Sequence, residues 1–230
     1  HISSVAVYGN PPGPMSEEVP LTHPLPPWDY YGRSKREGEK VATEVHGRHG
    51  MRVTILRPPA VFGERDRLFL PRLLRWLRRP VLLLPGSGRT LLPLVYAGNL
   101  VPVVERVLEG RDGGEVFNVT RDVEVTLRSL CEGLGRELGL TPRFVEIPGG
   151  LARGAAEWIE RLGARIPGAG DLPLSRAARL ALEDNPYPAD KARAVLGWEP
   201  PFSLEEAVAR VGQWLRDRET SIRGQWHDRQ

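Results

Sequence analysis

The feature that most constrains the fold is the order of the elements expected in the first part of the chain. The apolar run Ile2–Tyr8 predicts a buried strand, and the proline- and glycine-rich stretch 10–27 predicts a loop. Residues 31–49 have a helical pattern, and residues 52–57 predict a second strand. Strand, loop, helix and strand in this order form a βαβ unit. We therefore expect a parallel sheet with ligands at the carboxyl ends of its strands.

The rest of the chain predicts shorter helices and strands that form a second, smaller layer. We expect helices at 68–77, 99–108, 126–138, 151–162 and 204–218, and strands at 81–84, 115–119 and 143–147. Ser203 and Glu206 stand three residues apart at the start of the last helix, which predicts a capping box. The polar stretch 220–230 predicts a frayed tail.

Composition and charge indicate an ordinary globular chain. With 230 residues, of which 40% are hydrophobic and 27% charged, the chain can bury a sizeable core. Its 32 basic residues are scattered among 29 acidic ones and leave a net charge of only +3, which argues against a nucleic-acid partner. No apolar run approaches the roughly 20 residues that cross a bilayer, so we expect no membrane partner.

Cysteine and histidine usage predicts neither a disulfide nor a metal site. Cys131 is the single cysteine, which excludes an internal disulfide and suits a cytoplasmic location. His46 and His49 could share a metal at their spacing, but no third ligand stands nearby, so we interpret them as part of a solvated helix face. The chain begins with His1 inside an apolar run, and we expect this start to be a truncation.

Tyr31 and Lys35 are the first residues that suggest chemistry. They stand four apart at the start of the expected helix, so both side chains project from one face. A phenol is a poor base at neutral pH, and lowering its pKa from about 10 to about 7 requires roughly 4 kcal/mol of phenolate stabilisation. A neighbouring ammonium supplies part of it, and a cationic nicotinamide ring supplies more. Taken alone, the pair is also consistent with an ordinary surface pair.

Further motifs surround this pair in a fixed order along the chain. They occupy residues 2–9, 56–63, 86–89, 94–100, 114–119 and 190–200. Together with the Tyr-x-x-x-Lys pair, this set resembles the extended short-chain dehydrogenase/reductase family, also called the NAD-dependent epimerase/dehydratase family. The resemblance covers most of the chain. It implies an α/β fold, the C-terminal part of a Rossmann-type parallel sheet plus a smaller α/β substrate-binding region.

The resemblance also implies how the chain is divided. Residues 1–63 would be the remnant of a dinucleotide-binding Rossmann domain that carries the Tyr-x-x-x-Lys helix. Residues 64–219 would be mainly a substrate-binding region, and residues 220–230 a frayed tail. Family members often dimerise through the helix of the Tyr-Lys pair, so the resemblance implies a homodimer as well.

The resemblance assigns roles to three residues. Tyr31 would be the general acid/base, Lys35 would hydrogen-bond the nicotinamide ribose and lower the tyrosine pKa, and Ser4 would hydrogen-bond the reacting oxygen. Ser3 and Tyr30 are the alternatives. Ser4 is preferred because it stands four residues before a tyrosine, as the family serine does, and Tyr30 is off the face of Lys35.

Pro58 and Pro59 match the family turn that contacts the nicotinamide end of NAD or NADP, although a proline pair can also simply end a strand. The phosphate-binding Gly-x-x-Gly-x-x-Gly turn of the family does not occur in these 230 residues. Gly133, Gly135 and Gly139 fall in a helical stretch with no preceding strand and do not match it. We therefore expect the chain alone to bind dinucleotide weakly, to be inactive and to aggregate.

Two departures from the family pattern bear on the substrate. Leu92 and Pro93 stand where sugar-nucleotide members have an Arg-Asp pair, and Ala60 stands where they have asparagine. Residues 96–99 resemble the 3-beta-hydroxysteroid-dehydrogenase-like branch, whose substrates are more apolar. The implied function is an NAD(P)-dependent oxidoreductase or epimerase that transfers hydride to or from a secondary alcohol or ketone, a small-molecule substrate. The alternatives are a nucleotide-sugar epimerase or dehydratase, and a catalytically silent NAD(P)-binding sensor.

Overall fold

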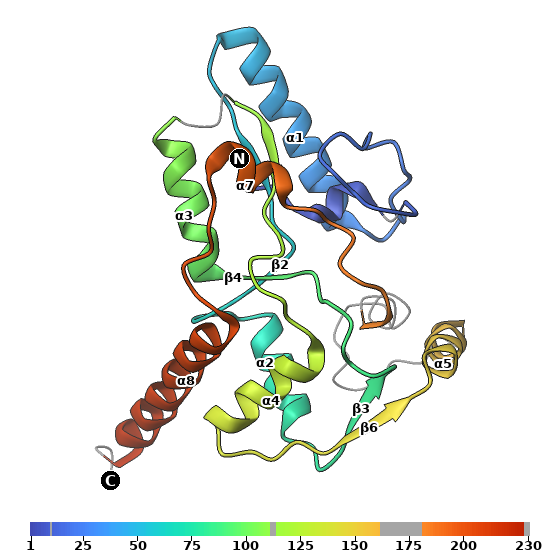
Figure 1. Ribbon diagram of the computed structural model, residues 1–230, viewed down its shortest axis with the longest axis vertical. Coiled ribbons are helices and arrows are strands. Elements are labelled where there is room, and N and C mark those ends of the chain that lie inside the picture. The colour runs from blue at the N-terminus through green and yellow to red at the C-terminus, as the bar shows by residue number, and fades with distance from the viewer. Residues whose placement is uncertain (10, 111–113, 162–180, 228–230) are drawn as a thin grey trace. The chain divides into compact units, whose positions relative to one another are not determined.

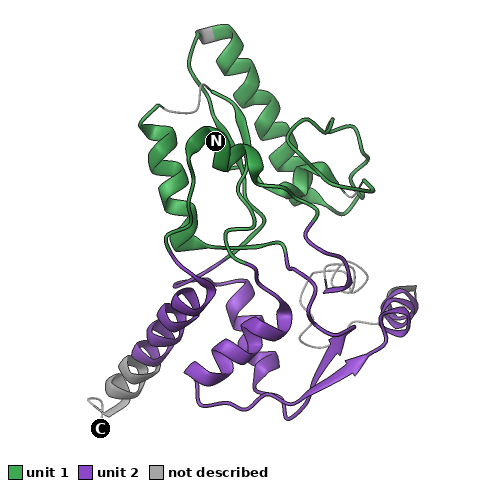
Figure 2. Ribbon diagram, viewed as in Figure 1, with its two compact units in different colours: residues 1–61, 93–123, 186–201 green, residues 62–92, 124–185, 202–230 purple. Residues whose placement is uncertain are grey.

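The computed structural model describes residues 1–9, 11–110, 114–161 and 181–227 (Figure 1). These residues form two compact units, each assembled from three stretches of the chain (Figure 2). Unit 1 consists of residues 1–61, 93–123 and 186–201, and unit 2 of residues 62–92, 124–185 and 202–230. The chain first passes from unit 1 to unit 2 between residues 61 and 62, close to the expected boundary at residue 63. The two later stretches of unit 1 had been expected in the substrate-binding region.

A parallel sheet lies at the centre of unit 1. Strand β1 (Ile55–Arg57) pairs in parallel with β5 (Val116–Asn118). Ile2 adds a parallel bridge to Leu56, and the Ser3 N–H donates to the Leu56 carbonyl over 2.7 Å. Three chain segments therefore run side by side, and the predicted parallel arrangement is confirmed.

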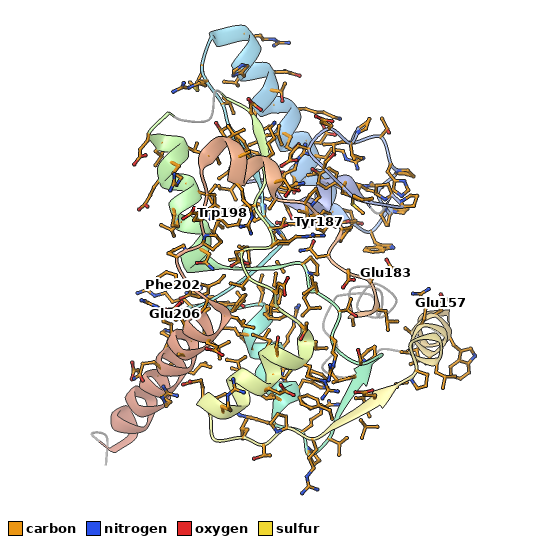
Figure 3. The ribbon with its side chains drawn as sticks, viewed as in Figure 1. Glu157, Glu183, Tyr187, Trp198, Phe202 and Glu206 are labelled. Atoms are coloured by element: carbon orange, nitrogen blue, oxygen red, sulfur yellow. The ribbon has the colours of Figure 1, made fainter. Side chains whose placement is uncertain are left out.

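The predicted first strand is wrong beyond its first residues. Val5–Tyr8 forms a buried 3-10 helix, η1, and the Ser4 side chain caps its start by accepting a hydrogen bond from the Ala6 N–H. A short continuous apolar run is compatible with either a buried strand or a buried helical turn, so periodicity could not distinguish them. The apolar side of η1 packs in a cluster with Met15 and Tyr187, and the ring of Tyr187 stacks on that of Tyr8 with 5.9 Å between the ring centres. Tyr187 is labelled in Figure 3.

Helix α1 (Tyr30–His49) confirms the predicted crossover helix. It begins because the Asp29 carboxylate accepts a hydrogen bond from the Gly32 N–H over 2.8 Å. It ends because Gly50 adopts the left-handed conformation, with φ of 63°, that favours glycine at this position.

Helices α3 (Ala97–Leu108) and α7 (Asp190–Leu196) pack on the sheet through one hydrophobic cluster. Its buried members are Leu56, Val103, Phe117, Val119, Ala189, Ala192, Leu196 and Trp198. Trp198, labelled in Figure 3, is buried. Its indole N–H donates to the Asn99 carbonyl over 3.0 Å, which satisfies the polar atom of the ring. The motif at residues 190–200 therefore contributes to the same hydrophobic core as the βαβ unit.

Two strands of three residues each were not predicted. Strand β2 (Ala60–Phe62) pairs with β4 (Leu94–Tyr96). Both are too short to show an alternating pattern, and β2 directly follows a proline pair that predicts a turn.

Unit 2 contains most of the helices and strands predicted for the smaller layer. They are α2 (Phe69–Leu77), β3 (Leu82–Pro85), α4 (Leu127–Glu137), β6 (Phe144–Ile147), α5 (Gly149–Arg161) and α8 (Leu204–His227). The helix expected at 99–108 and the strand expected at 115–119 belong to unit 1 instead, as α3 and β5. Strands β3 and β6 are parallel, and α4 packs on α8. The predicted capping box is confirmed, since the Ser203 and Glu206 N–H groups each donate to the other's side chain. Helix α8 includes residues 220–227 of the stretch that is expected to fray.

None of the described helices combines the length and the apolar character that crossing a membrane requires. Within the same part of the chain, no three His, Cys, Asp or Glu side chains gather as ligands for a metal ion.

Candidate active site

The predicted site residues belong to three elements of unit 1 that contact one another. The Arg36 guanidinium of α1 donates to the Val7 carbonyl of η1 over 2.5 and 3.1 Å. The Val5 N–H donates to the Pro58 carbonyl, at the end of β1, over 3.0 Å. Gly32, in the first turn of α1, approaches η1 so closely that a Cβ atom would lie 3.1 Å from the Ala6 carbonyl. The structure therefore brings the serine segment, the tyrosine helix and the proline turn together.

The two adjacent serines have different hydrogen bonds. Ser3 is 1% exposed, and its hydroxyl donates to the Glu39 carboxylate over 2.5 Å. Ser4 accepts a hydrogen bond from the Ala6 N–H at 3.2 Å. The described residues provide no acceptor for the Ser4 hydroxyl proton. Ser4 therefore has a proton to donate to a ligand oxygen, whereas Ser3 has already used its own.

Tyr31 and Lys35 lie on one face of α1, as their spacing predicts. The Lys35 ammonium lies 5.7 Å from the centre of the Tyr31 ring and donates to the Ile2 carbonyl over 2.9 Å. Tyr31 is 56% exposed, and its hydroxyl has no hydrogen-bond partner in the described part of the chain. Tyr30, the alternative, is 76% exposed. The Tyr31 hydroxyl is thus accessible, and Lys35 is tied to the segment that leads to Ser4.

Pro58 and Pro59 are both buried at the end of β1. Their position at the carboxyl end of a parallel strand is the position at which ligands bind in open α/β sheets. The Pro58 carbonyl is occupied by the Val5 N–H, so the turn also supports η1.

A buried polar network beneath these residues was not predicted. The Arg57 guanidinium donates to Glu39 over 2.9 and 2.7 Å and to the Tyr8 hydroxyl over 2.8 Å. The Tyr8 hydroxyl in turn donates to the Asn118 side chain over 2.9 Å. Burial raises the pKa of Tyr8 despite the nearby Arg57 cation, so this phenol stays protonated and is no candidate base. Burial lowers the pKa of Arg57, but Glu39 and Tyr8 outweigh it and the net shift is upward.

A groove of about 490 Å³ opens beside this network on the flank of α1. Its lining residues include Arg36 and also Glu39 and Arg57, so the ion pair of the network forms part of its wall. None of the five predicted site residues lines it, so it is not part of the candidate site.

The sequence was compared with known protein families to identify the family of the chain. The model of the NAD dependent epimerase/dehydratase family matches residues 1–120, more than half of the 230 residues. The chain belongs to this family. The resemblance inferred from the motifs is thereby confirmed, and so is the dependence of the family on NAD.

Two relatives are each 30% identical to this epimerase/dehydratase family member. One is the uncharacterized protein YbjS of Escherichia coli (strain K12), aligned over 81% of this chain and 57% of the relative. The other is a 4-hydroxy-2-methyl-3-oxo-4-farnesyl-3,4-dihydroquinoline-1-oxide ketoreductase of Stigmatella aurantiaca, aligned over 93% of this chain and 64% of the relative. The chain thus spans about three fifths of the length of these relatives.

The solved structures agree on the fold. UDP-glucuronic acid 4-epimerase from Bacillus cereus, in complex with NAD, superimposes with a TM-score of 0.64 at 20% identity. The match covers 94% of this chain and 60% of that one. The predicted Rossmann-type α/β fold is therefore confirmed.

The residues of this family member fit one end of a dinucleotide. One N–H of the Lys35 ammonium donates to the Ile2 carbonyl. The other two N–H groups could donate to the hydroxyls of a ribose. The buried proline turn contacts η1, whose N-cap is Ser4, through the hydrogen bond from the Val5 N–H to the Pro58 carbonyl. Gly133 and Gly135, the nearest approach to a phosphate-binding pattern, lie inside α4 as expected. The donors present therefore suit a nicotinamide and its ribose, and not the pyrophosphate.

The missed network had one signal in the sequence. Glu39 stands four residues after Lys35, which stands four after Tyr31, so all three lie on one stripe of α1. A carboxylate on a stripe that packs against a sheet requires a buried cation, and Arg57 occupies an inward position of the next strand. Searching for a charge pair between the two elements could have found it.

Proposed function

We propose that the protein transfers hydride between NAD or NADP and a secondary alcohol or ketone, with Tyr31 as the general acid/base. The observation that carries this proposal is the arrangement of three groups beside one sheet edge. Tyr31 has an accessible hydroxyl, Lys35 adjoins its ring, and Ser4 retains a proton to donate. Membership of an NAD-dependent family supplies the reaction class.

In the reducing direction, Ser4 and Tyr31 would both donate hydrogen bonds to the carbonyl oxygen of the substrate. These bonds polarise the carbonyl and place the Tyr31 proton where negative charge develops on the oxygen. A nicotinamide, when bound, would be the source or the acceptor of the hydride. Tyr31 would give its proton to the oxygen and so complete the alcohol. In the oxidising direction, deprotonated Tyr31 would take the hydroxyl proton, and the hydride of the substrate carbon would pass to the oxidised cofactor.

Lys35 has two tasks in this proposal. Its ammonium, 5.7 Å from the centre of the Tyr31 ring, would place a positive charge beside the group that transfers the proton. Its remaining N–H groups would bind the nicotinamide ribose. Because Lys35 is held by the Ile2 carbonyl, its ammonium is oriented before any ligand binds.

Apolar ketones are the proposed substrate class. Leu92 and Pro93 offer no charge-assisted hydrogen bonds for a diphosphate. The Stigmatella aurantiaca relative, whose name describes a farnesylated ketone, supports the same class. The UDP-glucuronic acid 4-epimerase structure supports the second candidate, epimerisation or dehydration of a nucleotide sugar. Reductase assays with apolar ketones, compared with binding of UDP- and dTDP-sugars, distinguish the two.

Two further properties belong to the proposal. A homodimer through α1 is supported by the exposed Val41 side chain on that helix, which is 61% accessible. A cytoplasmic location is supported by the single cysteine. The 230 residues alone are proposed to be inactive, because they contain no glycine-rich turn to bind the pyrophosphate.

Replacing Tyr31 by phenylalanine in the whole protein tests the proposal. We expect kcat for ketone reduction to fall by about 10²–10⁴-fold, the usual contribution of a positioned acid, while NAD(P)H still binds. Tyr30→Phe is the matched control, since Tyr30 is the adjacent, more exposed tyrosine, and its kcat should stay at the wild-type value. Undiminished reductase activity of Tyr31→Phe would remove Tyr31 from the mechanism. Cofactor binding without turnover by the wild type would instead indicate the sensor.

A further inference from the structure

We infer that the buried Glu39–Arg57 pair is a positioning device for Ser4, and that it acts by holding η1 on both sides of that serine. The inference rests on the proposed function, in which Ser4 hydrogen-bonds the reacting oxygen. It adds four positioning residues that do not touch the substrate: Ser3, Tyr8, Glu39 and Arg57.

Two groups of contacts fix η1, and we call them the first and the second hold. The first hold lies immediately before Ser4. The Ser3 hydroxyl donates to Glu39 over 2.5 Å, and both side chains are buried. The Lys35 ammonium binds the Ile2 carbonyl one residue earlier. Lys35 and Glu39 belong to the α1 stripe that begins with Tyr31, so one helix face carries the acid/base and also holds the serine segment.

The second hold lies at the end of η1. Tyr8 is its last residue and is fully buried, and its hydroxyl receives a hydrogen bond from Arg57 and donates one to Asn118 on β5. The Arg57 guanidinium also lies 4.8 Å from the centre of the Tyr8 ring. Because Arg57 binds Glu39 with its other nitrogens, the two holds are joined through one ion pair.

A contribution to stability alone does not explain why the buried Glu39–Arg57 ion pair is present. Well-packed apolar side chains often replace a buried ion pair without loss of stability. Charge-assisted hydrogen bonds, however, are short and directional, and between buried side chains they fix the atoms that they join. Ser4 lies between the two holds, so its hydroxyl is placed relative to the Tyr31 stripe. Misplacement of a reacting group by about 1 Å can cost a hundredfold in rate.

A double-mutant cycle in the whole protein tests this inference. Ser3→Ala should lower kcat by about 10- to 100-fold and leave KM for NAD(P)H unchanged, because Ser3 acts only on the reacting end. Ser4→Ala should lower kcat further. If Ser3 works through Ser4, the Ser3→Ala/Ser4→Ala double variant should have the same kcat as Ser4→Ala. Tyr8→Phe, which removes the hydroxyl of the second hold, should show the same dependence on Ser4.

Ser203→Ala is the matched control, because it also removes a serine side-chain hydrogen bond but in the capping box of α8. It should lower the melting temperature and leave kcat unchanged. The inference is overturned if Ser3→Ala and Tyr8→Phe retain wild-type kcat, or if each lowers kcat by the same factor in the Ser4→Ala background. Wild-type kcat of Ser4→Ala would be a separate result, since it refutes the proposed role of Ser4 itself.

Discussion

Replacing Arg57 by methionine should destabilise the protein more than any surface substitution. The Arg57 side chain is 5% exposed and that of Glu39 is 6%, and two hydrogen bonds of 2.7 and 2.9 Å join them. Methionine leaves the Glu39 carboxylate buried without its cation, which costs about 3–5 kcal/mol of unfolding free energy. For a chain of this size each kcal/mol lowers the melting temperature by about 2–4 °C, so we expect a drop of roughly 6–20 °C.

The double variant Glu39→Met/Arg57→Met shows whether the charge is the cause. Removing both side chains leaves neither charge of this pair buried, and the remaining cost is that the Ser3 hydroxyl loses its acceptor, at about 1–3 kcal/mol. The double variant should therefore be more stable than Arg57→Met. Urea unfolding followed by tryptophan fluorescence measures all four members of the cycle. If the two single losses simply add in the double variant, the pair is not coupled and the reasoning is refuted.

Two further predictions concern buried titratable groups outside the site. Burial raises the pKa of the Cys131 thiol to about 12, so iodoacetamide at pH 8 should label it only after unfolding, and labelling of the native protein would contradict its burial. Burial also raises the pKa of the Asp122 carboxyl, so the folded state holds that proton more tightly than the unfolded state. The resulting stabilisation is complete below the ordinary pKa of about 4 and is lost as the pH rises through the folded pKa. Asp122→Asn should lack this loss, and parallel urea midpoints of variant and wild type from about pH 3 to 7 would refute it.

Elements that begin and end through local interactions were predictable from the sequence. The end of α1 depends on Gly50, and the start of α8 depends on Ser203 and Glu206. Each of these devices involves residues within one turn of the helix terminus, so the sequence pattern contains the whole cause. The positions of Tyr31 and Lys35 were predictable for the same reason, since four residues along a helix always share a face.

Features that depend on distant partners were not predictable in this way. The 3-10 helix η1 stands where a strand was predicted, and the hydroxyl of its Tyr8 accepts a hydrogen bond from Arg57, 49 residues away. Strand β2 depends on its pairing with β4 rather than on a pattern of its own. In each case the local sequence permits two conformations, and tertiary contacts select one.

The choice between Ser3 and Ser4 shows how structure adds to a motif. Position in the motif favoured Ser4, but two adjacent hydroxyls on one segment are chemically equivalent until their partners are known. Glu39 accepts the hydroxyl proton of Ser3 in a hydrogen bond. Ser4 accepts a hydrogen bond from the backbone of η1, so its own hydroxyl proton remains available. The same carboxylate that removes Ser3 from consideration as a donor also holds the segment on which Ser4 is carried. The buried network therefore reaches the proposed reaction site through adjacent residues, because it binds Ser3 and Ser3 is bonded to Ser4. For this reason, disrupting the network should lower kcat before it weakens cofactor binding.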